Sequence, residues 1–304
     1  MSNSLSFSGH ESFQCRNLWL KKGYDFLTDP DGLEFSDNRA GIHLGVGKNM
    51  VTSIRYWLDA FGVRDDSDKT KASELGDRLF HKENGWDPYL EDLGSLWLLH
   101  YLLVSRGQEK ASIYHLVFNK FRKQRIEFTK DHLINFLINY SDEQGESHSP
   151  NTIKTDVGVF LKTYIKPNSK EANKNIEDLF SSLLIELNLV KEIENTRAEN
   201  KKRWYIIESS ERESLPIEIF FYSILDTNEG QNSRESISLH NLLNADNSPG
   251  NVFALHPDAL VSMVEQLVQK YDGIIYKEDG GIRELQIQKS FKENEILEDY
   301  YGNR

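Results

Sequence analysis

The chain has 304 residues, of which 38% are hydrophobic and 28% are charged. That hydrophobic share is enough for packed cores and excludes a wholly disordered chain, and the length favours two or three domains. A single cysteine excludes an internal disulfide framework and a zinc site built from cysteines. No apolar run approaches the roughly 20 residues that cross a bilayer, and no export signal is recognisable. We therefore expect a cytoplasmic protein with no membrane partner.

The net charge of −12 is unevenly distributed. Residues 1–100 contain 11 basic and 16 acidic residues, residues 101–207 contain 17 and 14, and residues 208–304 contain 8 and 18. Overall acidity argues against nucleic acid, because cations that contact phosphates supply most non-specific affinity. The basic middle third nevertheless favours a face for polyanions, beside an acidic part for other partners.

The first motif is the segment FSGHESFQCRNLWLKKGYD, which begins at residue 7. His10 beside Glu11 has the chemistry of a general base, and Arg16 could bind a phosphate through both of its terminal nitrogens. These three residues are therefore candidate catalytic groups. The alternative is that His10 and Arg16 bond backbone carbonyls where the N-terminus docks on the core.

Residues 44–63, LGVGKNMVTSIRYWLDAFGV, favour a helix-turn-helix. The GVGK sequence fails as a phosphate-binding loop, since Ile42 stands where that loop needs glycine and Asn49 where it needs Ser or Thr. Two glycines instead predict a tight turn before a helix over 48–61, with apolar residues at helical spacing on one face. The opposite face predicts DNA contacts from Lys48, Asn49, Thr52, Ser53 and Arg55. A merely solvated helix face is the alternative.

Residues 85–92, GWDPYLED, are a candidate metal site. Asp87 and Glu91 could hold Mg²⁺ or Mn²⁺ for phosphodiester hydrolysis. The alternative is local structure, with Asp87 as a helix N-cap and Pro88 in the first turn.

The next part of the chain predicts helices at 95–104, 111–121, 129–140 and 176–188. A further helix after Ser149 and Pro150 lies in residues 149–166 and is a second candidate for DNA contact. A basic run and the connection between two strands could line the same groove. The residues concerned are Lys120, Arg122, Lys123, Arg125, Lys154, Lys201, Lys202 and Arg203.

Two pairs of strands are predicted, each close behind a helix. Residues 189–193 and 203–207 form the first pair. Residues 273–287 form a hairpin after a helix at 257–270, because Gly280 and Gly281 allow a tight turn. This order indicates a mainly α protein with short β-hairpins and a tandem winged-helix or helix-turn-helix architecture. The expected domains are 1–106, 107–212 and 213–304, the last of them acidic.

Three blocks resemble a bacterial family known as a domain of unknown function: FSGHESFQCRNLWLKKGYD, LGVGKNMVTSIRYWLDAFGV and GWDPYLEDLGSLWLLHYLL. The best-understood member of that family is the B component, a DNA nickase, of the Ssp DNA phosphorothioation system. The resemblance implies an antiviral role in which one strand of double-stranded DNA is nicked so that sulfur can be incorporated. It also implies sulfur-transfer and ATPase components as partners.

Three functions remain open on the sequence. The first is a DNA nickase that depends on a metal ion, and the second is a non-catalytic DNA-binding adaptor or regulator that recruits modification enzymes. The third is a protein-interaction scaffold that uses the acidic C-terminal third. Because winged-helix proteins often pair, a homodimer is also an expected state.

Overall fold

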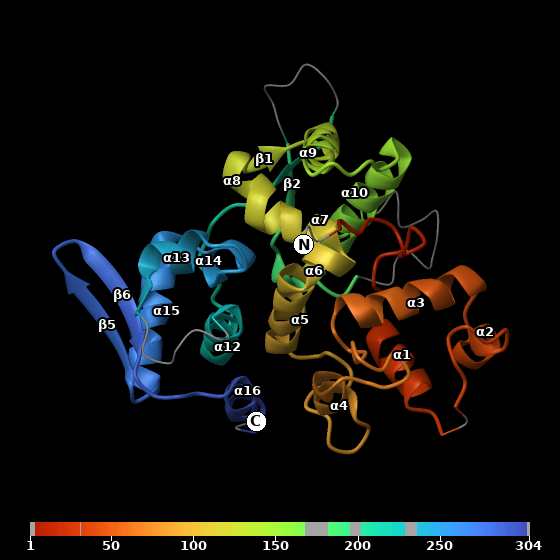
Figure 1. Ribbon diagram of the computed structural model, residues 1–304, viewed down its shortest axis with the longest axis horizontal. Helices are drawn as coiled ribbons and strands as arrows, with labels where there is room; N and C mark the ends of the chain where they lie inside the picture. The colour runs from red at the N-terminus through yellow and green to blue at the C-terminus, as the bar shows by residue number, and fades with distance from the viewer. Residues whose placement is uncertain (1–3, 31, 168–181, 195–201, 229–235, 303–304) are drawn as a thin grey trace. The chain divides into compact units, whose positions relative to one another are not determined.

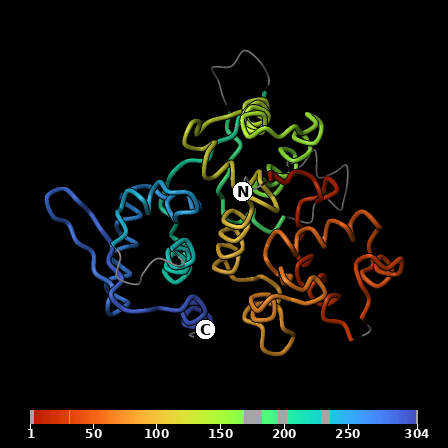
Figure 2. Tube along the Cα trace, in the orientation of Figure 1, coloured from red at the N-terminus to blue at the C-terminus, as the bar shows by residue number. Residues whose placement is uncertain are grey.

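The computed structural model describes residues 4–30, 32–167, 182–194, 202–228 and 236–302. The chain divides into two compact units, unit 1 (residues 1–207) and unit 2 (residues 208–304). Figures 1 and 2 trace the chain in colour from its N-terminus in red to its C-terminus in blue. The described residues are mainly helical and include two three-stranded antiparallel sheets. The expected division into three domains stays a prediction.

Unit 1 consists mostly of short helices. In chain order its described elements are α1 (Trp19–Leu27), α2 (Ala40–Leu44), α3 (Lys48–Ala60), α4 (Glu74–Phe80), α5 (Leu93–Ser105), α6 (Gly107–Lys110), α7 (Ser112–Leu116), the π-helical turn η1 (Val117–Phe121), α8 (Arg122–Gln124), β1 (Glu127–Phe128), α9 (Lys130–Glu143), α10 (Pro150–Tyr164), the 3₁₀ turn η3 (Ile185–Leu187), β2 (Lys191–Ile193) and β3 (Trp204–Ile206).

Helix α5 is the centre of the core of unit 1 and confirms the buried helix predicted at 95–104. Every side chain from Gly94 to Val104 is buried. A helix that is hydrophobic on all sides must be surrounded by other elements, and α5 contacts α6, α7 and η3. Nδ1 of its His100 lies 2.9 Å from the hydroxyl oxygen of Tyr164 on α10, and this hydrogen bond links the two helices.

The predicted turn and helix at 44–61 are confirmed as the α2–α3 pair. Gly45 ends α2 with a φ of 63°, a left-handed conformation that glycine adopts without strain. Val51, Ile54, Trp57 and Leu58 bury one face of α3.

The middle of unit 1 shows how caps fix helix starts. Ser149 caps α10 with Pro150 in its first turn, as predicted. Thr129 caps α9 in a reciprocal capping box with His132, which the sequence reading did not anticipate. The helix predicted at 111–121 is instead α7 followed by the π-helical turn η1.

The sheet of unit 1 has the strand order β1-β3-β2. The predicted pair 189–193 and 203–207 is confirmed as β2 and β3, with Glu192 opposite Tyr205. Strand β1 was not predicted, and it places Phe128 opposite Tyr205 on the other edge. Residues 176–181 of the helix predicted at 176–188 lie outside the described residues, and the described remainder is not an α-helix but contains the 3₁₀ turn η3.

Unit 2 repeats this combination of helices with a small sheet. Its described elements are α12 (Ile217–Thr227), β4 (Ser236–Ser238), α13 (Leu239–Asn244), α14 (Pro249–Val252), α15 (Pro257–Lys270), β5 (Ile274–Asp279), β6 (Ile282–Ile287) and α16 (Glu293–Gly302). Helix α15 and the long β5–β6 hairpin, drawn in blue in Figure 1, confirm the predictions for this region. Gly280 and Gly281 form the turn with φ of 56° and 84°.

No helix in the described ranges is long and apolar enough to cross a membrane.

Candidate nucleic-acid interface

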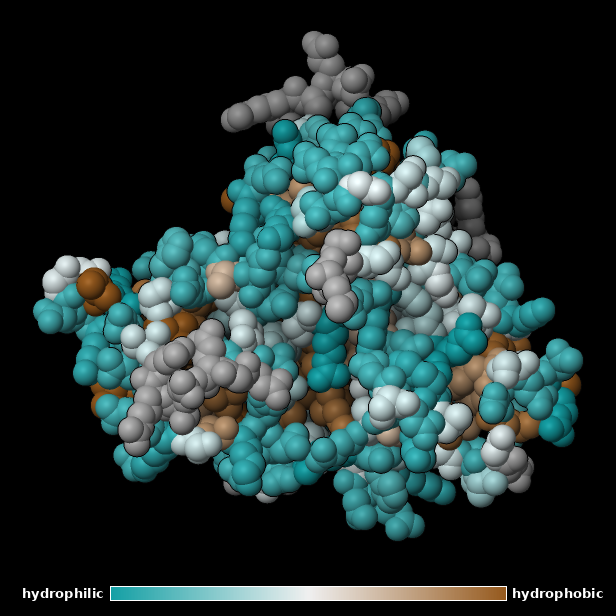
Figure 3. Space-filling model, viewed as in Figure 1, coloured by the Kyte–Doolittle hydropathy of each residue, from teal (hydrophilic) through white to brown (hydrophobic). Residues whose placement is uncertain are grey.

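Five basic side chains gather near the start of α9. Arg125 follows α8, Lys130 is the first residue of α9, Lys154 is on α10, and Lys202 and Arg203 precede β3. All five are exposed, and we call them the α9 basic cluster. In Figure 3 the part of unit 1 that carries α8 and α9 is covered mainly by hydrophilic residues. Segments far apart in the sequence thus bring basic side chains close to Asp131 and His132 at the start of α9.

Asp131 and Glu192 contact this cluster. Lys202 Nζ lies 2.6 Å from Asp131 Oδ2, and Arg203 Nε lies 3.6 Å from Glu192 Oε1. A hydrogen bond from Lys202 and its positive charge lower the pKa of Asp131, with smaller effects of His132 and Lys154. These contacts offset part of the positive charge that Lys202 and Arg203 contribute to the cluster.

The pKa of His132, which lies beside the cations of this cluster, is lowered as well. Burial lowers this pKa most, and the positive charge of Arg125 lowers it further. Asp131 acts in the opposite direction, and Lys202 again lowers the pKa. The imidazole is therefore biased toward its neutral form, as expected beside several cations.

Local folding explains why the cluster forms here. The Thr129 hydroxyl accepts the His132 N–H (3.4 Å), and His132 Nδ1 accepts the Thr129 N–H (3.2 Å), so the start of α9 is fixed. Pairing of Phe128 with Tyr205 brings the segment before β3 to the same place. A hollow of about 230 Å³ lies between them, lined by Thr129, Lys130, Asp131, Lys202, Arg203 and Tyr205. The positive end of the α9 dipole adds to the attraction for anions.

The structure brings together four of the predicted DNA-contacting residues and adds a fifth. Lys130 was missed, although its place directly after a Thr cap was a usable signal. Lys120 and Arg122 are partly buried, whereas Lys123 is exposed. Lys201 lies outside the described residues.

Helix α3 offers a second exposed polar surface. Lys48, Asn49 and Arg55 are exposed, and Thr52 is partly buried. Ser53 is completely buried, so its predicted place on the exposed face is wrong: it lies beside Ile54 on the core side of the helix. The one acid of α3, Asp59, is held by Arg64 and Lys69, each at 3.0 Å. Its charge is thereby offset.

The N-terminal segment from Leu5 to Phe13, which we call the strap, crosses the surface of several elements of unit 1. The backbone N–H of Leu5 donates to both carboxylate oxygens of Glu146 at 3.0 and 2.9 Å. The N–H of Ser8 donates to both oxygens of Asp156 on α10 at 3.1 and 3.0 Å. Farther along, Trp57 Nε1 donates to the Phe13 carbonyl at 3.1 Å. The strap thus joins α3 to α10.

His10 is part of this strap and is buried, with 2% of its surface exposed. Its Nδ1 accepts the Ser12 N–H at 3.2 Å, which places the proton of a neutral ring on Nε2. Nε2 lies 3.1 Å from Asp156 Oδ1, but the two atoms form no hydrogen bond. The ring stacks on Trp57 with centroids 6.3 Å apart.

The other two candidate catalytic residues have different surroundings. Glu11 is exposed on a backbone with a φ of 47°. The Arg16 guanidinium lies over the rings of Phe13 and Trp19, 5.6 and 5.2 Å from their centroids. A buried His, an exposed Glu and an Arg on aromatic rings do not resemble one reacting constellation, and the catalytic role of these residues stays a prediction.

The residues proposed to hold a metal ion are engaged in a turn. Asp87 is 8% exposed, and its two carboxylate oxygens accept the N–H groups of Glu91 (2.9 Å) and Asp92 (3.0 Å). Asp92, not Asp87, caps the following helix, since its carboxylate accepts the Gly94 N–H at 2.6 Å. Among the described residues, no group of three or more His, Cys, Asp or Glu side chains is placed to hold a metal ion. Asp87 thus has a structural role in this turn, and the metal-binding role of Asp87 and Glu91 stays a prediction.

Comparisons with known proteins agree with the resemblance in the three sequence blocks. A crystal structure of magnesium ion-bound SspB has a TM-score of 0.81 and 29% sequence identity, over 98% of this chain and 88% of that one. A second SspB crystal structure has a TM-score of 0.80 and 30% sequence identity, over the same shares of the two chains. No curated protein matches the chain. The family model described as "Protein of unknown function (DUF4007)" matches residues 7–301, and the chain therefore belongs to the DUF4007 family.

Proposed function

We propose that this chain is the DNA-binding B component of a bacterial phosphorothioation system of the Ssp type, and that double-stranded DNA binds to unit 1. The α9 basic cluster carries the proposal. It presents five exposed cations from three segments on one surface. Basic side chains beside a helix N-terminus are the usual means of fixing a phosphate backbone. The similarity to SspB over nearly the whole chain supports the assignment to that system.

The order of elements supports a winged-helix interpretation of both units. Among the described elements of unit 1, β1 is followed by α9, α10, the 3₁₀ turn η3 and the β2–β3 pair. In unit 2, β4 is followed by three helices and the β5–β6 hairpin. Helix α10 takes the place of a recognition helix, and its exposed residues Asn151, Lys154 and Thr155 suit contacts with phosphates and base edges.

Fluorescence anisotropy with a labelled 25–30-base-pair duplex (a length of about three helical turns) tests this proposal. Lys130→Ala and Lys202→Ala should each weaken binding severalfold, because each variant removes one contact to phosphate. Lys277→Ala is the matched control, an exposed lysine on β5 of unit 2, and it should leave the affinity unchanged. Equal affinities for all four proteins would refute DNA binding through the cluster.

Two activities fit such a component, and different observations support them. The resemblance to the Ssp nickase supports cutting of one strand. The burial of His10 and the engagement of both Asp87 oxygens by backbone amides support recruitment of modification enzymes without catalysis. Similarity to a magnesium-bound SspB makes Mg²⁺ the first ion to test.

Relaxation of supercoiled plasmid separates the two activities. Purified protein is incubated with plasmid and Mg²⁺, Mn²⁺ or EDTA, beside the His10→Ala and Glu11→Ala variants. Open circles that form with metal and disappear with Glu11→Ala would establish nicking that involves the exposed part of the loop. Intact plasmid under all conditions, with DNA binding preserved, would establish the adaptor function.

We also propose that sulfur-transfer and ATPase components bind this protein, and that a homodimer is its working state. The acidic composition of unit 2, with 8 basic and 18 acidic residues, suits contacts with basic surfaces of partner proteins rather than with DNA. Light scattering of the purified chain measures its mass in solution. Co-purification with the products of neighbouring genes, at low and high salt, tests the partners.

A further inference from the structure

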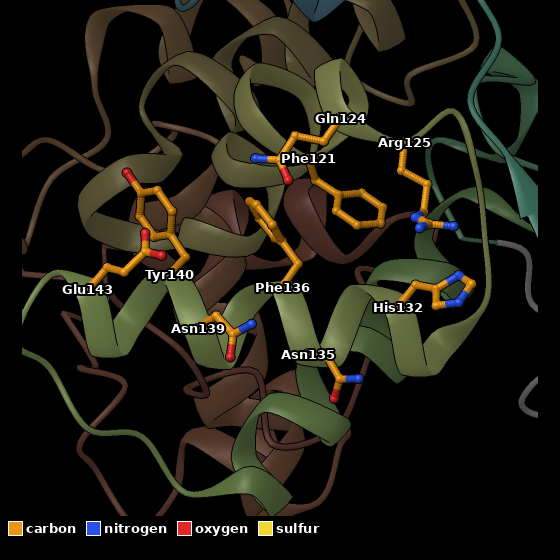
Figure 4. A pocket seen from close by; sticks show the side chains of 9 residues that line it. All are labelled: Phe121, Gln124, Arg125, His132, Asn135, Phe136, Asn139, Tyr140 and Glu143. Atoms are coloured by element: carbon orange, nitrogen blue, oxygen red, sulfur yellow. The ribbon is translucent and has the colours of Figure 1, made fainter.

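A pocket beside the α9 basic cluster has a lining unlike that of a simple phosphate-binding surface. It has a volume of about 440 Å³ and lies between the η1–α8 segment and α9 (Figure 4). Its side chains are aromatic rings, amides and a few charged groups. They belong to Phe121, Gln124, Arg125, His132, Asn135, Phe136, Asn139, Tyr140 and Glu143.

The aromatic rings give the pocket flat apolar surfaces. The ring centroids of Phe121 and Phe136 are 5.1 Å apart, and those of Phe136 and Tyr140 are 5.9 Å apart at an angle of 32°. Phe121 is buried beneath, while Phe136 and Tyr140 are partly exposed. Partly exposed aromatic faces of this kind are suited to stacking against a planar ring.

The amides supply hydrogen-bonding groups around these rings. Asn135 and Asn139 are one turn apart on α9, and Gln124 comes from the other wall. Within the described ranges, the amide groups of these three side chains form no intramolecular hydrogen bond. Each amide offers both a donor and an acceptor, the combination found on the edge of a nucleobase.

The combination of aromatic rings and amide groups limits the class of ligand that the pocket can bind. A purely apolar ligand would leave the amide groups without partners, and an inorganic ion would gain nothing from the aromatic faces. A planar ring with hydrogen-bond donors and acceptors on its edge would stack on the aromatic rings and also bond to the amide groups. The volume is sufficient for a base together with its sugar.

The position of the pocket indicates where such a base would come from. Arg125 lines the pocket and also belongs to the α9 basic cluster, and His132 lines it beside Lys130 and Asp131. Figure 4 shows Arg125 and His132 at one end of the pocket and Tyr140 and Glu143 at the other. A nucleotide with its phosphate on the cluster therefore has its base within reach of the rings.

We propose that this pocket receives one unpaired nucleobase of a DNA strand whose phosphates bind the α9 basic cluster. The proposal rests on the proposed DNA-binding function and adds a preference for DNA in which a base has left the stack. Since stacking and edge contacts stabilise a base outside the helix, the pocket would open the strand at the bound position.

Anisotropy with three labelled duplexes tests the pocket. One duplex is fully paired, one contains a single bulged adenine, and one contains an abasic residue at the bulge, which keeps the flexibility but lacks the base. We expect the bulged adenine to bind about tenfold tighter than the abasic bulge, the order of effect of stacking one base on an aromatic side chain. The Asn135→Ala/Asn139→Ala double variant and Phe136→Leu should lose this difference.

The control and the outcomes separate the pocket from the proposed function. Asn241→Ala, which alters an exposed amide on α13 of unit 2, should keep the preference for the bulged adenine. Equal binding of the adenine and abasic bulges by the wild type, with paired duplex still bound, would overturn the pocket and leave DNA binding standing. Failure to bind any of the three duplexes would instead overturn the proposed function itself.

Discussion

His10 and Asp156 show how one pair of residues can suggest two different roles. In the sequence, His10 beside Glu11 and Arg16 is typical of a catalytic loop. In the folded chain, His10 and Asp156 are both 2% exposed and lie 3.1 Å apart, and the carboxylate of Asp156 also accepts the Ser8 N–H. Ser8, Glu11 and Ser12 have positive φ, a strained backbone that these contacts must maintain.

Replacing Asp156 is expected to destabilise unit 1. Asp156→Ala leaves the Ser8 N–H without its acceptor and removes the carboxylate beside His10, and leaving a buried polar group without a partner costs about 1–3 kcal/mol of unfolding free energy. Urea denaturation measures the change. Glu11→Ala, on the exposed side of the same loop, should alter the stability by less than about 0.5 kcal/mol. Equal stability of both variants would show that the strap does not depend on this carboxylate.

Asp66 should contribute to acid sensitivity. Burial raises its pKa, but hydrogen bonds from Lys110 (2.6 Å) and Lys69 (2.8 Å) outweigh this and lower it to about 2. A carboxyl with a depressed pKa stabilises the fold above its unfolded pKa of about 4, and this contribution is lost as the pH falls toward 2. Because Asp66 is largely exposed, the effect should stay below about 1 kcal/mol.

Measuring the unfolding free energy between pH 5 and pH 2 tests this prediction, because that interval spans the unfolded and folded pKa values of Asp66. Asp66→Asn should show a smaller loss of unfolding free energy than the wild type in this window, and the same slope above it. A variant whose curve parallels that of the wild type throughout would show that the two lysine contacts add nothing to stability.

At the scale of elements, periodicity and caps predicted much of the fold. Helices α3, α5, α10 and α15 and the β5–β6 hairpin were predicted from apolar spacing, Ser-Pro or Gly-Gly signals. Strand β1 was not, because its two residues are too short to show alternation, and it forms only through pairing with β3. The π-helical turn η1 was missed as well, since its sequence differs little from that of an α-helix.

The candidate site was predicted less well than the fold, because it too depends on contacts between distant parts of the chain. A basic run such as 120–125 is visible in the sequence, but only the fold shows that Lys120 and Arg122 are partly buried while Lys123 and Arg125 are exposed. Convergence of Lys130 with Lys202 and Arg203 depends on strand pairing between residues more than 70 positions apart. Such contacts are set by tertiary structure and have no local signature.

The cap of α9 is expected to support both the fold and the basic cluster. Thr129→Ala removes the hydroxyl that accepts the His132 N–H and should cost about 1 kcal/mol of unfolding free energy. Thr155→Ala, an exposed threonine within α10, is the matched control and should have almost no effect on stability. Thermal denaturation compares the two. If Thr129→Ala were as stable as the control, the capping box would not be what fixes the start of α9.

For the whole molecule, charge separates the two units. Unit 1 contains 28 basic and 30 acidic residues, whereas unit 2 contains 8 and 18. Unit 1 also contains the α9 basic cluster and the polar surface of α3. This separation agrees with the proposal that DNA binds to unit 1 and that unit 2 makes contacts of another kind.

Separate expression of the two units tests this assignment. Because each unit has buried hydrophobic residues of its own, fragments 1–207 and 208–304 should both show cooperative unfolding in circular dichroism. Fragment 1–207 should bind duplex DNA with nearly the affinity of the full chain, and fragment 208–304 should not bind it. Strong binding by folded fragment 208–304 would contradict the assignment.

The most direct test of DNA binding through the α9 basic cluster is the salt dependence of duplex affinity. The logarithm of the association constant is plotted against the logarithm of salt concentration for the wild type and for a Lys130→Ala/Lys202→Ala variant. We predict a steep negative slope for the wild type and a slope shallower by about 2 for the variant, since each lost phosphate contact removes about 0.9. Identical slopes for the two proteins would contradict the proposed interface.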